Sequence, residues 1–477
     1  MADSADPAPE PIVTTTTGAV RGVWRDGVAA FLGVPYAAPP VGAAAFAAPA
    51  PHQPWEGVRD GTEYGPTAPQ VGYPKPIAAL LANDIELGDE YLNANVWTPD
   101  PSPGAGLPVM VWIHGGAFTR GSNRLKIYAG DTFARGGVVF VGINYRLGIP
   151  GFASIEGAPE NRGLRDQIAA LTWVRENAAA FGGDPDNVTV FGESAGAMST
   201  ASLLSSPMAR GLFHRAIMQS GNGNAVFAVQ DARKVTAMLA GLLEVTPDAA
   251  GFASVSTDRL LKAQTDLALQ AQLDPNPAVF GESVVKAGMG IMTVAPVLDG
   301  EVLPDVPASS IAAGAGSGIP LIAGWNADEF RLFLVPTGVT AVVTEDMARA
   351  MVGGYDGGIA RLDEHLAAGT DLGDALCMVL TDIAFRDGTV ELARLRPDDP
   401  THLFEFGVPN NEANIGAGHA VELPYVFDHL ADGRSLTGPD ASQAVADAMH
   451  AAWLSFAKTG DPGWERYLPE QTVQRFD

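Results

Sequence analysis

This chain of 477 residues has little of three things: cysteine, positive charge and long apolar runs. Its one cysteine, Cys377, excludes a disulfide within the chain, and its apolar neighbours predict a core filler. The 29 Lys and Arg are outnumbered by 55 Asp and Glu, and the net charge of −26 argues against nucleic acid and anionic membranes as partners. Strongly anionic substrates should also be repelled, unless the pocket that receives them is locally basic.

Targeting signals and metal motifs are missing as well. No apolar run approaches the roughly 18 residues of a membrane-spanning helix, so no membrane partner is expected. Residues 1–11 are acidic and proline-rich, lack the basic and apolar parts of a signal peptide, and predict a flexible tail. With the single cysteine, this favours a cytoplasmic location. No ligand cluster such as His-Glu-x-x-His occurs, so neither a metal nor an organic cofactor is expected.

Apolar runs alternate with amphipathic segments through the middle of the chain. Residues 107–113 and 137–144 are typical of buried strands, and residues 164–177 carry apolar side chains three or four apart, as on a helix. A further apolar run leads into Ser194. This alternation predicts an α/β fold with a mostly parallel central sheet between two layers of helices.

No linker divides the chain despite its length. We therefore expect one domain over residues 12–477, with helical insertions at about 222–318 and 331–400 that cap it. A strand at 402–406 is expected to be the last of the sheet, and a helix at 444–458 closes the chain.

The segment Gly192-Glu193-Ser194-Ala195-Gly196 lies between a strand-like run and a helical run of small residues. A Gly-x-Ser-x-Gly turn in that context holds a serine hydroxyl exposed on a strained strand-to-helix connection, which suits a nucleophile. A Cβ at either glycine should collide with the neighbouring strand or helix. The pentapeptide alone is weak evidence, because a chain with 55 glycines can produce it by chance.

A nucleophilic serine needs a base and an acid that orients the base. Among the five histidines that follow the acid candidates Asp328 and Glu329, only His419 lies in a glycine-flanked loop just beyond a strand. That weakly packed position suits a base reaching across a cleft. Asp328 and Glu329 both follow the strand-like run 319–324, in the chain order serine, acid, histidine. The residues alone leave the choice between these two carboxylates open.

A reaction at a carbonyl group also needs donors for the oxyanion that develops. Gly115 and Gly116 directly follow the apolar run 107–113, and without side chains their backbone can approach a substrate closely. The N–H of Ala195 opens the helix after Ser194 and can point to the same place. These three groups are the candidate oxyanion hole.

With these residues assembled, the chain resembles the type-B carboxylesterases, a family of α/β-hydrolases. The resemblance extends over nearly all of the chain from Gly18 onward and rests on ordered motifs, among them Val111-Trp-Ile-His-Gly-Gly116, Asn144-Tyr-Arg-Leu-Gly148, Gly192-Glu-Ser-Ala-Gly196, Asp328-Glu329 and Gly418-His-Ala-Val-Glu-Leu-Pro424. It implies the α/β-hydrolase fold, Glu329 as the acid, and Gly115, Gly116 and Ala195 as the oxyanion hole. It also implies that Glu193 and Ser220 lie beside the catalytic residues.

The activity that follows is hydrolysis of neutral, small-molecule carboxylic esters through an acyl-enzyme on Ser194, with His419 as base. Cleavage of amides or carbamates by the same triad is an alternative. A second alternative is a non-catalytic binding protein on this fold, although Ser194, Glu329 and His419 are all present. The natural substrate does not follow from the sequence, and a monomer and a dimer are equally compatible with it.

Overall fold

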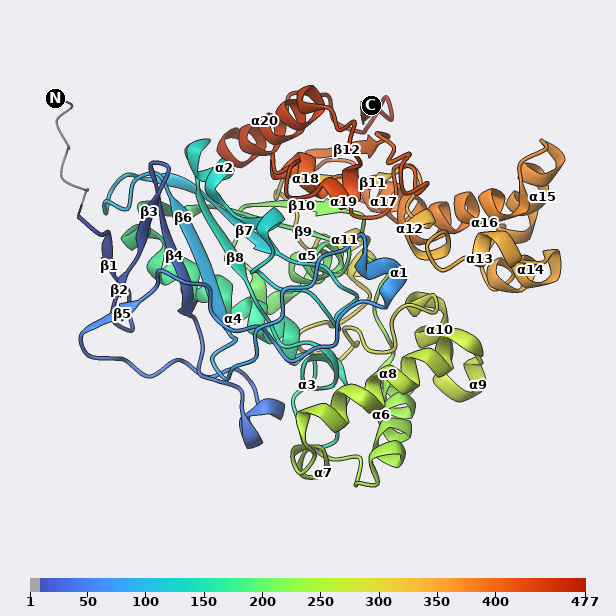
Figure 1. Ribbon diagram of the computed structural model, residues 1–477, viewed down its shortest axis with the longest axis horizontal. Helices are drawn as coiled ribbons and strands as arrows, with labels where there is room; N and C mark the ends of the chain where they lie inside the picture. Colours follow the sequence, from blue (N-terminus) through green and yellow to red (C-terminus); the bar gives the residue numbers. More distant parts are fainter. Residues whose placement is uncertain (1–8) are drawn as a thin grey trace.

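The structure, a computed structural model, describes residues 9–477 (Figure 1). Most of the tail expected at 1–11 therefore lies outside the described residues. Within the described part of the chain, no helix is long and apolar enough to cross a lipid bilayer.

Ten strands within residues 9–477 form one sheet, and seven neighbouring strands of it run parallel to one another. The spatial order is β13 (Val473–Phe476), β12 (Thr401–Phe406), β11 (Leu321–Asn326), β10 (Arg215–Gln219), β9 (Gly183–Glu193), β7 (Leu107–Ile113), β8 (Val139–Ile143), β6 (Asn93–Thr98), β4 (Val28–Pro35) and β3 (Val23–Arg25). The last three are antiparallel to their neighbours. A small separate sheet holds β1 (Ile12–Thr14), β2 (Ala19–Arg21) and β5 (Val58–Asp60).

Helices cover the sheet and also form two groups inserted between its strands (Figure 1). Between β10 and β11 lie α6 (Val229–Leu243), α7 (Ala249–Ala253), α8 (Thr257–Leu273), α9 (Pro277–Phe280), α10 (Glu282–Gly288) and α11 (Pro307–Ala312). Between β11 and β12 lie α12 (Arg331–Leu334), α13 (Val339–Val342), α14 (Glu345–Val352), α15 (Gly358–Ala367), α16 (Leu372–Thr381) and α17 (Asp387–Arg394). The others are α1 (Lys75–Ala78), α2 (Asp131–Arg135), α3 (Gly148–Phe152), α4 (Arg162–Asn177), α5 (Ala195–Ser205), α18 (Leu423–Val426), α19 (Arg434–Thr437) and α20 (Gln443–Thr459).

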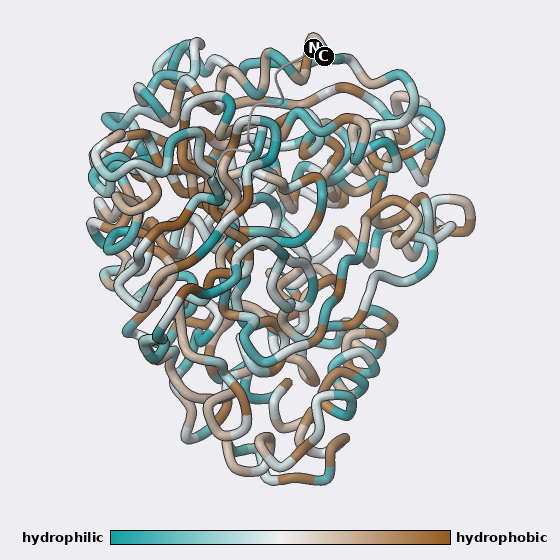
Figure 2. The backbone as a smooth tube through the Cα atoms, turned by 60° about the vertical axis from the view of Figure 1, so that its left-hand side comes forward, coloured by the Kyte–Doolittle hydropathy of each residue, from teal (hydrophilic) through white to brown (hydrophobic). Residues whose placement is uncertain are grey.

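The sheet separates two apolar cores, and β7 contributes to both. Val109, Val111 and Ile113 pack into one core, while Met110 and Trp112 pack into the other, because successive side chains of a strand point to opposite faces. Burial on both faces explains why the sequence of this strand is continuously apolar. In Figure 2 such hydrophobic stretches run through the inside of the molecule.

Two sequence predictions can be checked directly against these elements. Cys377 on α16 is buried, as expected for a core filler, and burial raises the pKa of its thiol to about 12. The expectation that 402–406 is the last strand is wrong, because β13 pairs with β12 at the edge of the sheet. Its sequence, Val-Gln-Arg-Phe, has only one fully buried side chain, so its strand character comes from pairing and not from an apolar run.

A fully buried ion pair joins the loop after β8 to α4. Arg146 donates from Nε and Nη2 to the two carboxylate oxygens of Asp166, at 2.8 and 2.7 Å, and neither side chain is exposed. Nη1 donates to the backbone carbonyls of Ala45 and Ala47, at 3.1 and 2.6 Å. All the polar groups of the guanidinium are therefore used to fix the loop against the N-terminal segment.

We predict that Arg146→Leu lowers the free energy of unfolding by about 3–5 kcal/mol, since it leaves Asp166 as a buried charge without a partner. Urea denaturation followed by circular dichroism measures the change. Lys262→Ala, which breaks an exposed pair with Asp266 on α8, is the control and should leave the midpoint nearly unchanged. Equal midpoints for the two variants would contradict the role given to the buried pair.

Candidate active site

Ser194 lies at the tight turn between β9 and α5. Its backbone has φ 54° and ψ −121°, a strained conformation that residues with a side chain rarely adopt. A Cβ on Gly192 would lie 2.5 Å from the backbone of Gly196, and one on Gly196 would overlap the carbonyl oxygen of Ile113 at the end of β7. The steric prediction for both glycines is confirmed, and the strained turn lifts the Ser194 side chain into a cavity.

His419 and Glu329 are in direct contact. His419 Nδ1 lies 2.5 Å from Glu329 Oε2, and its backbone N–H donates to the Glu329 carbonyl at 3.2 Å. The other carboxylate oxygen of Glu329 accepts the backbone N–H of Asn326 at 2.8 Å. Asp328 does not contact the imidazole but accepts the N–H of Ala417 at 2.9 Å, and so anchors the loop that carries His419.

The expectation that His419 is weakly packed is wrong. Its ring lies between Phe333 and Phe385, with ring centroids 5.1 and 5.0 Å away, and only 5% of the residue is exposed. Both phenylalanines belong to the second helical insertion, so nothing in the loop sequence itself signals this packing.

Glu193, the neighbour of Ser194, faces the other nitrogen of the imidazole. His419 Nε2 lies 3.0 Å from Glu193 Oε1, and no hydrogen bond joins the Ser194 hydroxyl to His419 within the described residues. Burial raises the pKa of Glu193 to about 8, against the influence of the imidazole. Burial also disfavours the imidazolium, but Glu193 and Glu329 outweigh it and raise the pKa of His419 to about 9.

A third glutamate, Glu422, completes the acidic surroundings and was not predicted as a site residue. It is fully buried and accepts hydrogen bonds from Gln219 at 3.1 Å and Asn326 at 2.6 Å. Burial and the nearby Glu329 raise its pKa to about 7. The available signal was an acid three residues after His419 in an otherwise apolar stretch.

Ser220 is also buried, and its hydroxyl has no hydrogen-bond partner among residues 9–477.

In the loop after β7, the carbonyl groups of His114, Gly115 and Gly116 accept hydrogen bonds, whereas the N–H groups of the two glycines do not donate any within residues 9–477. The carbonyls of His114 and Gly115 accept hydrogen bonds from Tyr145 Oη and His114 Nδ1, each at 2.8 Å, and that of Gly116 accepts two backbone N–H groups. The N–H groups of Gly115, Gly116 and Ala195 bond to no residue in the described chain. Gly115 and Gly116 line the cavity beside Ser194, while Ala195, the first residue of α5, directly follows Ser194 and is fully buried. Backbone N–H groups next to a nucleophile are what an oxyanion site requires.

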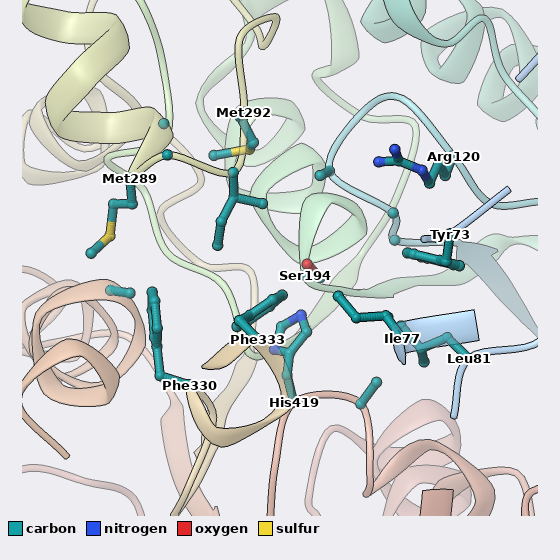
Figure 3. A pocket seen from close by; sticks show the side chains of 18 of the residues that line it. Tyr73, Ile77, Leu81, Arg120, Ser194, Met289, Met292, Phe330, Phe333 and His419 are labelled. Carbon is teal, nitrogen blue, oxygen red and sulfur yellow. The ribbon is translucent and has the colours of Figure 1, made fainter. Parts of the chain in front are cut away.

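A cavity of about 1050 Å³ opens in front of Ser194 and His419 (Figure 3). Its walls are mainly apolar and come from the segment around α1 and from both helical insertions. The apolar lining residues labelled in Figure 3 are Ile77, Leu81, Met289, Met292, Phe330 and Phe333. This volume suits a small organic molecule. Residues 9–477 contain no group of three or more potential ligands placed to hold a metal ion.

The chain is similar to known proteins over nearly its whole length. A model described as the carboxylesterase family matches residues 9–474. The chain is 39% identical to the para-nitrobenzyl esterase of Bacillus subtilis (strain 168), over 95% of this chain and 91% of that protein. It is 35% identical to the phenmedipham hydrolase of Pseudarthrobacter oxydans, over 98% and 93%. A solved PNB esterase structure matches with a TM-score of 0.83 and 36% identity, over 98% of this chain and 96% of that one. The fold class predicted from the sequence is confirmed.

We predict that Glu193→Gln lowers the pKa of His419 by about 1 unit or more, because it removes one of the two carboxylates that contact the imidazole. A pH titration of histidine-labelled protein by NMR measures the shift. Glu301→Gln, at an exposed carboxylate far along the chain, should leave the titration unchanged. An unaltered or raised pKa in the Glu193 variant would show that its carboxylate does not support the imidazolium.

Proposed function

Because this chain belongs to the carboxylesterase family and is a carboxylic ester hydrolase, we propose that it cleaves small-molecule esters through an acyl-enzyme on Ser194. One observation carries the proposal: His419, held by Glu329 at Nδ1, shares the cavity wall with the strained Ser194 and with Gly115 and Gly116. The amide N–H groups of these two glycines, like that of Ala195, bond to no described residue. A nucleophile, an oriented base and oxyanion donors are what acyl transfer needs.

In the first half of the reaction, Ser194 Oγ attacks the ester carbonyl carbon and its proton passes to His419 Nε2. The carbonyl oxygen becomes an oxyanion, which accepts hydrogen bonds from Gly115, Gly116 and Ala195. The C–O bond to the alcohol then breaks, and the alcohol leaves with the proton of His419. Glu329 keeps Nδ1 protonated and stabilises the imidazolium throughout.

In the second half, a water molecule gives its proton to His419 Nε2 and attacks the acyl carbon. The second tetrahedral intermediate collapses, the carboxylic acid leaves, and Ser194 recovers its proton.

Glu193 has two opposing effects in this scheme. Its carboxylate, 3.0 Å from Nε2, stabilises the imidazolium that forms during attack. It also competes with the Ser194 hydroxyl for Nε2, so the resting contact must loosen before proton transfer.

Amide or carbamate cleavage by the same triad is a second candidate, and the similarity to a phenmedipham hydrolase is the observation that favours testing it. An amide's leaving group is a poor one until it is protonated, so that reaction depends more on the acid form of His419. Rates on an ester and an amide with the same acyl and aryl groups separate the two activities, and we expect the ester to react faster.

We predict that Ser194→Ala lowers kcat/KM on para-nitrophenyl butyrate by about 10⁴-fold or more, because it removes the nucleophile. Circular dichroism should show an unchanged fold. Ser254→Ala, at an exposed serine, is the matched control and should keep wild-type activity. Activity of the Ser194 variant close to that of the wild type would end the proposal.

A fluorophosphonate probe tests the same serine without a substrate. Peptide mapping after labelling should place the adduct on Ser194, and the label should be lost in Ser194→Ala and reduced in a His419→Ala variant. An adduct on a different serine would contradict the assignment.

A further inference from the structure

Arg120 is a cation on the wall of the cavity, four residues beyond Gly116. Its backbone N–H donates to the Gly116 carbonyl at 3.0 Å, which fixes it to the loop that carries the free amides. Figure 3 shows its side chain on the same side of Ser194 as Tyr73, with the guanidinium directed toward the cavity, while Met289 and Phe330 lie on the opposite side. The guanidinium carbon stands 5.5 Å from the centre of the Tyr73 ring.

The charge of Arg120 has no anionic partner. Within the described residues, no carboxylate oxygen lies within 4.0 Å of it, whereas the other charged side chains on the cavity wall are paired. Lys286 pairs with Glu282 at 2.9 Å, and Asp84 pairs with Arg124 at 3.4 Å. Desolvation of an uncompensated cation is costly, and accordingly burial lowers the pKa of Arg120.

Structural arginines in this chain are bound far more completely. Arg162, fully buried, donates four hydrogen bonds of 2.6–3.1 Å to backbone carbonyls. Arg120 makes two long bonds to neutral acceptors, from Nε to the Gly72 carbonyl at 3.4 Å and from Nη1 to Thr119 Oγ1 at 3.3 Å, and its Nη2 bonds to no described residue. Nη2 is therefore free to donate to a ligand, and the long bonds of Nε and Nη1 leave these nitrogens weakly held.

We propose that the preferred substrates are esters that carry a carboxylate group, which pairs with Arg120 when the ester carbonyl is at Ser194. This inference rests on the proposed function and narrows its substrate class, replacing the neutral esters expected from the sequence. The planar fork of arginine matches the two oxygens of a carboxylate. Since the net charge of −26 repels anions, a local cation is also what such a substrate needs in order to enter.

Two matched ester pairs test the proposal, one with the charge on the acyl side and one with it on the alcohol side. The first is para-nitrophenyl hydrogen glutarate against para-nitrophenyl hexanoate, and the second is para-acetoxybenzoate against para-isopropylphenyl acetate. We expect Arg120→Gln, which keeps a hydrogen-bonding side chain without the charge, to lower kcat/KM about 10- to 100-fold on the charged member of at least one pair, mainly through KM. The neutral members should change less than about twofold, and Arg120→Lys should recover part of the loss.

Equal losses on the charged and neutral members, or no loss on either charged ester, would overturn the substrate class. If the wild type hydrolysed none of the four esters, the proposed function itself would fail. Binding then still tests Arg120. In calorimetric titrations with para-acetoxybenzoate and with monomethyl glutarate, the double variant Ser194→Ala/Arg120→Gln should bind at least one of the two more weakly than Ser194→Ala alone. Unchanged affinity for both would reject the role of Arg120.

Discussion

The site depends on how closely the end of β7 approaches the turn at Ser194. The carbonyl oxygen of Ile113 occupies the space that a side chain at position 196 would need, and the backbone of Gly196 does the same for position 192. Because two backbones touch there, the loop after β7 and the first turn of α5 are held in one fixed relation. The strained turn at Ser194 and the Gly115–Gly116 loop meet next to that contact.

Much of this arrangement could be predicted because it is local. The strand at 107–113, the glycines around Ser194 and the position of the free amides follow from short stretches whose periodicity or sterics are visible in the sequence. The choice between Asp328 and Glu329 is different, since adjacent carboxylates differ only in which one the fold turns toward His419. The packing of His419 and the strand β13 also depend on partners far along the chain, Phe333, Phe385 and β12.

Electrostatics divides the cavity into two regions of opposite sign. On one side, Glu193, Glu329 and Glu422 are gathered around His419, and they favour its charged form at the cost of burying three carboxylates. On the other side, Arg120 stands in a strongly acidic protein without a carboxylate beside it. The first region surrounds an imidazole that can gain and lose a proton, whereas the second holds an arginine whose charge is fixed.

Glu329 and His419 lie on either side of the second helical insertion in the sequence. Glu329 lies two residues before α12 and His419 lies beyond β12. The contacts Glu329–His419 and Asp328–Ala417 join the two ends of this stretch. Because these contacts join the two ends, a longer or shorter insertion mainly alters loop-closure entropy and keeps Glu329 and His419 together. The same insertion supplies the rings that clamp His419 and part of the wall that faces a ligand. A change in this insertion that reshapes the cavity wall therefore also reaches the rings that pack against His419.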